Sequence, residues 1–311
     1  MIEQKKVRNM TELVVLIGFP ACGKSTYAKE LKMKGYHIYS SDKLREEFYG
    51  DENIQGVAND IFLELTRRIK KDLNSGYSCV LDATNLNRKK RKNFLANFRN
   101  IKCVKRCVLF LVPLEECKRR NQLRDRTVIE EVFSRKKEEF QCPAKYEGWD
   151  EIEIQRMENL NYRFPFEQAM NFSQSTPFHS LTLGEHMQAA EAYCKQKDYS
   201  SQVQLAAKYH DCGKLYTQTF FNSKGLPSDR AHYYGHENYS AYLFLLEMFS
   251  QKENHLSKEE ILYVANLINW HMNPHNSWKV SKKAQMRDRQ LMGQEMYQDI
   301  MCLHEADVAA H

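Results

Sequence analysis

The stretch LVVLIGFPACGKST, residues 13–26, decides how the first part of this chain folds. Its apolar beginning predicts a buried strand, and the segment that follows has the pattern of a helix. Between them, two glycines precede a lysine and a serine in the spacing GxxxxGKS, which is the phosphate-binding loop. In such a loop backbone N–H groups face phosphate oxygens, the lysine reaches the β- and γ-phosphates, and the serine binds Mg²⁺. We therefore expect a site for ATP and Mg²⁺ at Gly18, Ala21, Cys22, Gly23, Lys24, Ser25 and Thr26.

Short apolar runs recur along the first half of the chain, as expected of parallel strands buried on both faces. They lie at residues 13–19, 36–40, 77–84 and 106–113, with one further candidate at 149–154. Helical patterns separate them. The alternation predicts a three-layer α/β domain built on a parallel sheet.

The periodicity changes after residue 160. Residues 161–180 contain two prolines and interrupt the helical pattern, so we place a linker at 161–176. The later patterns are helical, and they predict an all-α domain over residues 177–311. We therefore expect two domains, 1–160 and 177–311, each burying its own core.

The charge of the chain is unevenly divided. Residues 1–165 hold 33 Lys and Arg against 24 Asp and Glu, whereas residues 166–311 hold 13 against 16. The basic half either meets a polyanion or is a solvated lysine-rich surface. The nine cysteines form no CxxC pair, which favours reduced thiols and a cytoplasmic protein. No apolar run approaches the length of a membrane span, so we expect no membrane contact.

Residues 40–48, SSDKLREEF, suggest how an acceptor is activated. Ser40 or Ser41 is a candidate helix N-cap, which places Asp42 and Arg45 on one helical face. A carboxylate there can accept a proton from an attacking hydroxyl, while the guanidinium holds an anionic part of the acceptor. The alternative is a surface ion pair. The position after the second predicted strand, on the side of the phosphate loop, favours the catalytic interpretation.

Three later features complete the predicted phosphoryl-transfer site. Asp82 ends the third predicted strand, where a carboxylate can support Mg²⁺. Arg120 and Arg124 share a helix face and can close over the transferring phosphoryl group as a lid. The basic run 88–92 is either a solvated helix face or a nucleic-acid patch.

Together these motifs resemble the kinase domain of polynucleotide 5′-kinases of the bacteriophage and bacterial end-healing type. GFPACGKST, DKLR, DATNLN, and VP followed by KRRNQLR occur in the family's order within about the first 150 residues. The resemblance implies transfer of the ATP γ-phosphate to a 5′-hydroxyl end of RNA or DNA. It implies Asp42 as general base, Arg45 as the ligand of the acceptor phosphate, and Arg120 and Arg124 as the lid. The chain departs from the pattern at Lys43, which replaces an acid, and at Ala83, since its acid stands one position earlier.

Residues of metal-ligand type are spread over the predicted helices of the second half. Adjacent His and Asp near a helix end can reach one cation, and packed helices can add further ligands. The candidates are His186, His210, Asp211, His236, His271 and Asp307, with His179, His232 and His275 as flanking residues. The chain ends four residues after Asp307, so we expect this last ligand to be loosely held.

The order H…HD…H…H…D with HDCGK resembles the HD-domain metal-dependent phosphohydrolases over residues 177–311. That resemblance implies phosphoester hydrolysis by a metal-activated water, with His186, His210, Asp211 and Asp307 as the primary ligands. His236 and His271 match the histidines of members with a second metal, and Lys214 would lie near the substrate phosphate. The ligands are compatible with one or two ions of Mn²⁺, Ni²⁺, Fe or Mg²⁺.

The two halves together resemble bacterial bifunctional enzymes that heal broken nucleic-acid ends. The resulting hypothesis is a 5′-hydroxyl kinase joined to a phosphohydrolase of 2′, 3′ or cyclic phosphates, with RNA or DNA ends and a separate ligase as partners. Two alternatives stay open. One is a small-molecule kinase, for a nucleoside or sugar, fused to a nucleotide phosphohydrolase. The other is an RNA-binding module gated by ATP, although Asp42 has no purpose in such a switch.

Overall fold

The computed structural model describes residues 10–51, 58–124, 127–176, 180–251 and 254–310. Its first half is built on one five-stranded sheet in the order β2-β3-β1-β4-β5. All four strand pairings are parallel. The strands are β1 (Glu12–Ile17), β2 (His37–Ser40), β3 (Cys79–Asp82), β4 (Val104–Leu111) and β5 (Glu151–Arg156). The predicted parallel sheet is therefore confirmed, and the further candidate strand is its edge strand β5.

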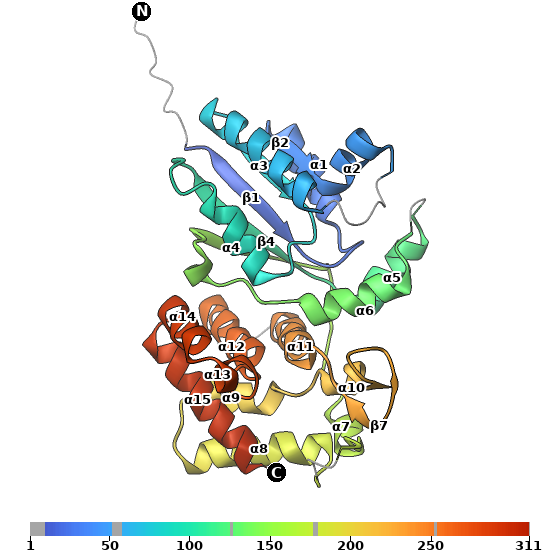
Figure 1. Ribbon diagram of the computed structural model, residues 1–311, viewed down its shortest axis with the longest axis vertical. Helices are drawn as coiled ribbons and strands as arrows, with labels where there is room; N and C mark the ends of the chain where they lie inside the picture. Colours follow the sequence, from blue (N-terminus) through green and yellow to red (C-terminus); the bar gives the residue numbers. More distant parts are fainter. Residues whose placement is uncertain (1–9, 52–57, 125–126, 177–179, 252–253, 311) are drawn as a thin grey trace, which may run out of the picture.

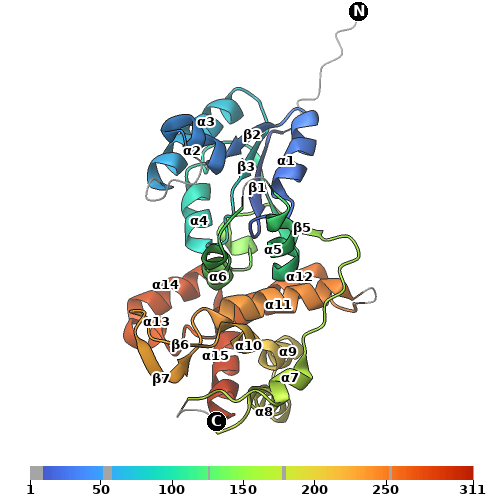
Figure 2. The ribbon, with the colours of Figure 1, turned by 90° about the vertical axis from the view of Figure 1, so that its right-hand side faces the viewer.

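Helices cover both faces of this sheet, as Figure 2 shows with α3 and α4 on one side and α1 on the other. The central strands are buried almost throughout, which explains their continuous apolar sequences. The helices of this half are α1 (Lys24–Met33), α2 (Ser41–Tyr49), α3 (Ala58–Asn74), α4 (Arg88–Ala96), α5 (Leu114–Gln122) and α6 (Glu130–Glu139). This arrangement, with helices on both faces of a parallel sheet, is the predicted three-layer α/β fold.

The second half is mainly helical, as its periodicity predicts (Figure 1). Its helices are α7 (Phe166–Met170), α8 (Leu183–Gln196), α9 (Ser201–Tyr209), α10 (Lys214–Thr217), α11 (His236–Ser250), α12 (Lys258–Trp270), α13 (Ser277–Val280), α14 (Lys282–Met292) and α15 (Gln294–Ala309). The expectation of helices alone missed one antiparallel hairpin, β6 (Thr219–Phe221) with β7 (Pro227–His232). These strands are short and mostly exposed, so their sequence lacks the apolar alternation of a half-buried strand.

The two halves meet at α6 and α11, which pack against each other between the sheet and the lower helices (Figures 1 and 2). Tyr242 of α11 donates to the carbonyl of Val112 at 2.7 Å and accepts from its N–H at 3.1 Å. Its ring also packs edge-on against Phe19 of the phosphate loop, with centroids 4.6 Å apart. The buried residues of both halves form one continuous hydrophobic cluster. The expected separate cores are therefore joined through α11.

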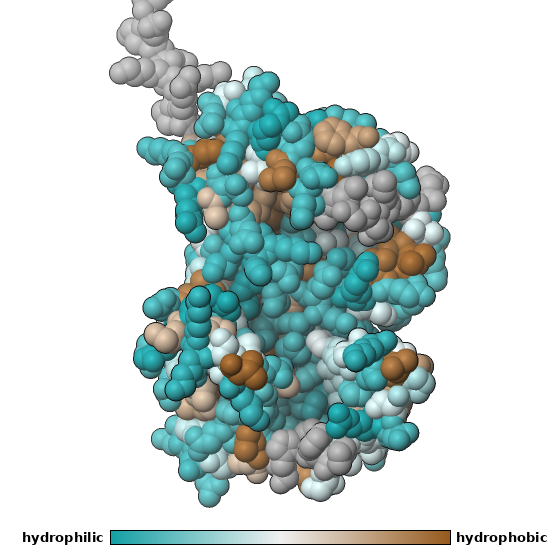
Figure 3. Space-filling view, viewed as in Figure 1, coloured by the Kyte–Doolittle hydropathy of each residue, from teal (hydrophilic) through white to brown (hydrophobic). Residues whose placement is uncertain are grey.

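The face drawn in Figure 3 is largely hydrophilic, with hydrophobic side chains scattered over it. No helix in the described part of the chain is long and apolar enough to cross a membrane.

Candidate functional site

The phosphate loop is shaped by its glycines at the carboxyl end of β1. Gly23 has a φ of +104°, a left-handed conformation that favours glycine, and the helix α1 begins at the next residue. A Cβ on Gly18 would lie 2.7 Å from the sulfur of Cys22, so the loop also needs glycine there for space. The loop therefore leads directly into the N-terminus of α1, whose first N–H groups can bind an anion.

Lys24 is buried and lies against its own loop. Its Nζ donates to the carbonyl oxygens of Gly18, at 3.0 Å, and Phe19, at 2.7 Å. A phosphate group that accepts from this ammonium would replace or share those carbonyl contacts. The ammonium is therefore held within reach of the loop that is predicted to bind phosphate.

Ser25, in the first turn of α1, meets Asp82 at the end of β3. The Ser25 hydroxyl donates to Oδ2 of Asp82 at 2.8 Å, and Asp82 is 8% exposed. A hydroxyl and a carboxylate oxygen form the kind of donor set that Mg²⁺ uses at phosphate sites. Asp82 therefore contacts Ser25, although the acid of the family pattern stands one position later, at Ala83.

The candidate base lies across the same edge of the sheet. Ser40 caps α2, with its hydroxyl accepting from the N–H of Lys43, which decides between the two predicted caps. Asp42 Oδ1 lies 2.7 Å from an Arg45 nitrogen, and the carboxylate is 48% exposed. The predicted pair exists, and its carboxylate remains accessible to an acceptor.

A cleft of about 1050 Å³ joins these groups. Its lining includes the predicted residues Ala21, Gly23, Lys24, Ser25, Thr26, Asp42, Arg45, Asp82, Arg120 and Arg124. Lys90 of the basic run 88–92 also lines it, as do two basic residues that sequence reasoning missed, Arg135 and Lys136. The last two lie on α6, where the signal was only a mixed run of charges. The structure thus brings the phosphate loop, the candidate base and the candidate lid to one basic cleft.

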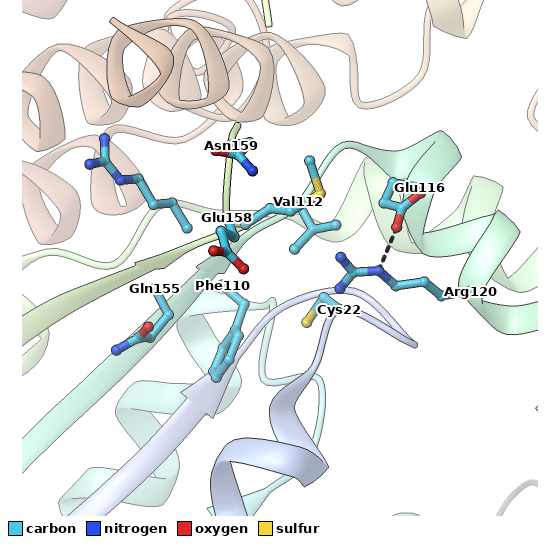
Figure 4. Close-up of a pocket in the computed structure, with 10 residues that line it drawn as sticks. Cys22, Phe110, Val112, Glu116, Arg120, Gln155, Glu158 and Asn159 are labelled. Atoms are coloured by element: carbon cyan, nitrogen blue, oxygen red, sulfur yellow. Dashed lines mark hydrogen bonds and ion pairs between the residues drawn. The ribbon is translucent and has the colours of Figure 1, made fainter. Parts of the chain in front are cut away.

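A smaller pocket of about 490 Å³ adjoins the phosphate loop at Cys22 (Figure 4). Phe110 and Val112 give it apolar walls at the end of β4, and Asn159 lies in the segment after β5. Arg120 lines both this pocket and the cleft, and its Nε donates to Glu116 at 2.6 Å. Charged and amide side chains make up most of the remaining lining, among them Gln155, Arg156 and Glu158.

The predicted metal ligands converge at helix ends of the second half. His210 and Asp211 follow α9, His236 begins α11, and His271 follows α12. His186 of α8 and Asp307 of α15 complete the set. The ligand atoms form two groups that share Asp211, the first His186, His210, Asp211 and Asp307, the second Asp211, His236 and His271.

The four histidines of this cluster are all oriented in the same way, with Nδ1 toward a backbone carbonyl. Each Nδ1 lies 2.7–3.2 Å from a backbone carbonyl, which fixes the proton there and leaves Nε2 as the inward ligand atom. The Nε2 atoms of His186 and His210 are only 3.1 Å apart. Those of His236 and His271 are buried and lie 3.0 and 3.6 Å from Oδ1 of Asp211. When the imidazoles are neutral, their inward lone pairs at this spacing fit a cation between them.

Asp211 spans the two groups through its two oxygens. Oδ2 lies 3.3 Å from Nε2 of His186, and Oδ1 lies 3.0 Å from Nε2 of His236. Burial opposes the ionised form of Asp211, but the Lys214 ammonium and the histidines hold its pKa well below the usual range. A buried carboxylate that stays ionised is suited to bridge two cations.

His186 and Asp307 are coupled electrostatically. Burial lowers the pKa of His186, but hydrogen bonds to Asp211 and Asp307 outweigh it and raise that pKa to about 9. The pKa of Asp307 is lowered by its histidine neighbours against the effect of burial. Asp307 lies inside α15 with a side chain 9% exposed, so the expectation of a loosely held ligand was wrong.

Lys214 approaches the cluster from α10. Its Nζ lies 2.5 Å from Oδ2 of Asp211 and 3.0 Å from the amide oxygen of Gln174. The ammonium is therefore placed beside the cluster and pairs with Asp211.

Two expectations need correction. The run 88–92 is neither a wholly solvated face nor a wholly exposed patch, because Arg88 and Arg91 are buried. Arg91 forms a bidentate pair with Glu147 at 2.6 and 2.7 Å. Of the flanking histidines, His232 bonds to Ser228 instead of joining the cluster, and residue 179 lies outside the described residues. His275 contacts Asp307.

A protein-family model matches part of the first half of the chain. Residues 13–143 match the AAA domain family. The match covers less than half of the chain and agrees with the phosphate loop and the parallel sheet described above. ATP and Mg²⁺ are typical of P-loop kinases of this fold.

A curated relative is the L-seryl-tRNA(Sec) kinase of Methanococcus maripaludis. It is 26% identical over 159 residues, which are 48% of this chain and 61% of that protein. The chain therefore spans less than two thirds of the length of this relative.

Solved structures match with low TM-scores. A structure titled as the Pnkp1/Rnl/Hen1 RNA repair complex gives a TM-score of 0.37 at 19% identity, over 44% of this chain and 48% of that chain. A second structure of a Pnkp1/Rnl/Hen1 complex gives 0.35 at 17% identity, over 63% and 70%. A gluconokinase from Sinorhizobium meliloti gives 0.34 at 15% identity, over 48% and 83%. At these TM-scores we draw no conclusion from the structural neighbours.

Proposed function

We propose that this protein is a bifunctional end-healing enzyme that acts on nucleic-acid ends, with RNA as the expected substrate. One centre phosphorylates 5′-hydroxyl ends from ATP, and the other removes 2′, 3′ or cyclic phosphates. The observation that carries the proposal is the presence of two separate constellations in one chain. An exposed carboxylate lines the same basic cleft as the phosphate loop, and five further buried ligands converge around Asp211.

In the kinase reaction the 5′-hydroxyl oxygen attacks the γ-phosphorus of ATP, and ADP leaves. Asp42 accepts the hydroxyl proton, while Arg45 holds a phosphate of the acceptor strand. Lys24 and the lid residues Arg120 and Arg124 stabilise the charge on the transferring group. Ser25 and Asp82 would hold Mg²⁺, which neutralises the charge of the phosphates.

The pocket beside Cys22 is suited to the base of ATP. It adjoins the phosphate loop, its walls include Phe110 and Val112, and Arg120 spans it and the cleft. A guanidinium stacks on a planar ring while its charge stays near the phosphates. The nucleotide would therefore lie with its base in the pocket and its phosphates in the cleft.

The cleft is large and basic, which favours a polyanionic acceptor over a small neutral one. Besides the phosphate-loop lysine it is lined by Arg45, Lys90, Arg120, Arg124, Arg135 and Lys136. Several phosphates of a strand can be neutralised there at once. A nucleoside or sugar would use only part of this charge.

In the hydrolytic centre, His186, His210, Asp211 and Asp307 would hold one divalent ion, and His236 and His271 with Asp211 a second. Bound Mn²⁺, Ni²⁺ or Fe would supply Lewis-acid activation of water and phosphate. The backbone bonds to each Nδ1 keep the imidazoles oriented, and Lys214 would position the substrate phosphate. The repaired ends are substrates for a ligase, so a separate ligase is the expected partner.

The test pairs one variant in each centre with a matched control. Asp42→Asn should reduce label transfer from γ-labelled ATP to a 5′-hydroxyl oligonucleotide by about 10²–10⁴-fold and leave phosphatase activity intact. Asp211→Ala should do the reverse and reduce bound metal. Glu46→Gln on α2 and Asp229→Ala on β7 are exposed carboxylate controls that should change neither activity.

Three results would contradict parts of the proposal. An unchanged kinase rate in Asp42→Asn would remove Asp42 as the base. Transfer to a free nucleoside or sugar but not to oligonucleotides would establish the small-molecule kinase instead. If the wild-type protein binds RNA in a nucleotide-dependent way but transfers no phosphate to any acceptor, the ATP-gated binding module is favoured.

A further inference from the structure

A third group of potential ligands lies beside the six-residue cluster. His275 is in the turn after α12, and His304 precedes Asp307 by one helical turn on α15. The ligand atoms of His275, His304 and Asp307 all lie within 4.8 Å of one another. The six-residue cluster does not use either histidine, so the group needs an explanation of its own.

Asp307 connects this group to the cluster through its two oxygens. Oδ1 lies 3.1 Å from Nε2 of His186 and 3.4 Å from Nε2 of His210. Oδ2 faces the other way and lies 2.8 Å from Nε2 of His275. Asp211 divides its oxygens between two groups in the same manner. The described ligands therefore form three groups in a row, joined by two bridging carboxylates.

The third group also brings two ring nitrogens face to face. Nδ1 of His304 lies 3.1 Å from Nε2 of His275, and the rings meet at 83° with centroids 4.3 Å apart. Two imidazole nitrogens and one carboxylate oxygen are a common donor set for first-row transition metals. The same close approach of nitrogens occurs between His186 and His210 in the first group.

The third group is more open than the other two. His275 has 29% of its side chain exposed, and His304 is also partly exposed, whereas the histidines of the cluster are buried. Three protein ligands leave coordination positions free for water or a substrate oxygen. A cation held here would be the one that solvent and substrate reach first.

We propose that His275 Nε2, His304 Nδ1 and Asp307 Oδ2 bind a third divalent transition-metal ion next to the hydrolytic centre. This proposal rests on the proposed function, because Asp307 is also a ligand of that centre. The ion's free positions suit a non-bridging oxygen of a phosphate ester. The competing explanation is a hydrogen-bond chain from His304 through His275 that only orients Asp307.

The experiment measures how many equivalents of Mn²⁺ the full chain binds. The protein is dialysed to equilibrium against Mn²⁺ without nucleotide, and the bound metal is determined by elemental analysis. His304→Gln is the main variant, because Gln removes the imidazole ligand while His275, which contacts Asp307 at 2.8 Å, stays in place. His255→Gln is the matched control, an exposed histidine elsewhere. An ion bound at the kinase site would be present in all variants, so it does not affect the difference in bound Mn²⁺ between a variant and wild type.

We expect His304→Gln to bind one equivalent fewer than wild type and His255→Gln, and Asp211→Ala to lose at least one. A His304→Gln protein that binds as much Mn²⁺ as wild type, while Asp211→Ala loses metal, overturns the third site alone. If Asp211→Ala also binds as much as wild type, the proposed metal centre fails with it. Far-ultraviolet circular dichroism identifies a variant that has not folded, in which case His275→Gln replaces it under the same criteria.

Discussion

The buried pair between Arg91 and Glu147 gives a prediction whose size follows from the structure. Both side chains are 0% exposed, and the guanidinium donates to both carboxylate oxygens as well as to the carbonyls of Asn85 and Leu86. Arg91→Met keeps the apolar stem but removes the bidentate cation from a buried carboxylate, whose other cationic neighbour is Arg88 with Nε 3.8 Å away. Breaking such a pair from one side costs about 3–5 kcal/mol.

The remaining contacts of Glu147 place the expected cost at the lower end of that range. Trp149 donates to it from Nε1 at 3.1 Å, and the N–H of Ala144 donates at 3.2 Å. We therefore expect Arg91→Met to lower the free energy of unfolding by about 3 kcal/mol. Adding Glu147→Gln should recover part of the loss, because the unpaired charge is then removed as well.

The assay is urea unfolding followed by circular dichroism, with Lys89→Met as control. Lys89 is exposed on the same helix, so its replacement should change the unfolding free energy by less than about 0.5 kcal/mol. Equal effects of the two substitutions would refute the reasoning. A loss of RNA binding in Arg91→Met with unchanged stability would instead make residue 91 part of a nucleic-acid surface.

Three further predictions test the junction, the Mg²⁺ site and the thiols. Tyr242→Phe leaves the buried N–H and carbonyl of Val112 without their partner, so we expect about 1–3 kcal/mol lower stability in urea unfolding; no change would mean that the hydroxyl does not stabilise the junction. Asp82→Asn should raise the Mg²⁺ concentration for half-maximal kinase activity by about 10–100-fold, measured by Mg²⁺ titration, and an unchanged titration would remove Asp82 from the site. Iodoacetamide should label Cys302, the one cysteine of the nine that is not buried, before any other. Burial raises the pKa of Cys142 to about 12, so raising the pH from 7 to about 9 should leave this thiol unlabelled until the protein unfolds, as peptide mass mapping would show.

The sequence best predicted those features that depend on residues close to one another along the chain. The phosphate loop needs glycines, a lysine and a serine within a few residues, and Asp42 follows a helix cap that is visible in the sequence. The convergence of His186 with Asp307 could not be worked out from spacing, because it depends on packing α8 against α15. The residue types made both candidates for a metal site, and the resemblance to a family implied that they belong to one ligand set.

Features that depend on distant partners escaped prediction. A run of basic residues looks the same whether its side chains are solvated or buried, and the partner that buries Arg91 lies 56 residues away. Tyr242 and Val112 are separated by 130 residues, so the joined core has no local signature. His304 was missed because a lone histidine on a helix becomes significant only when His275 is found beside it.

The central claim is that one chain modifies both ends of a broken strand at two separate centres. The most direct measurement incubates an RNA oligonucleotide bearing a 5′-hydroxyl and a 3′-phosphate with the protein, ATP, Mg²⁺ and Mn²⁺, and determines the state of each end by mass spectrometry. We predict a phosphate gained at the 5′ end and one lost at the 3′ end, with Asp42→Asn blocking only the gain and Asp211→Ala only the loss. An oligonucleotide unchanged at both ends, or a single variant that abolishes both reactions in a folded protein, would contradict the claim.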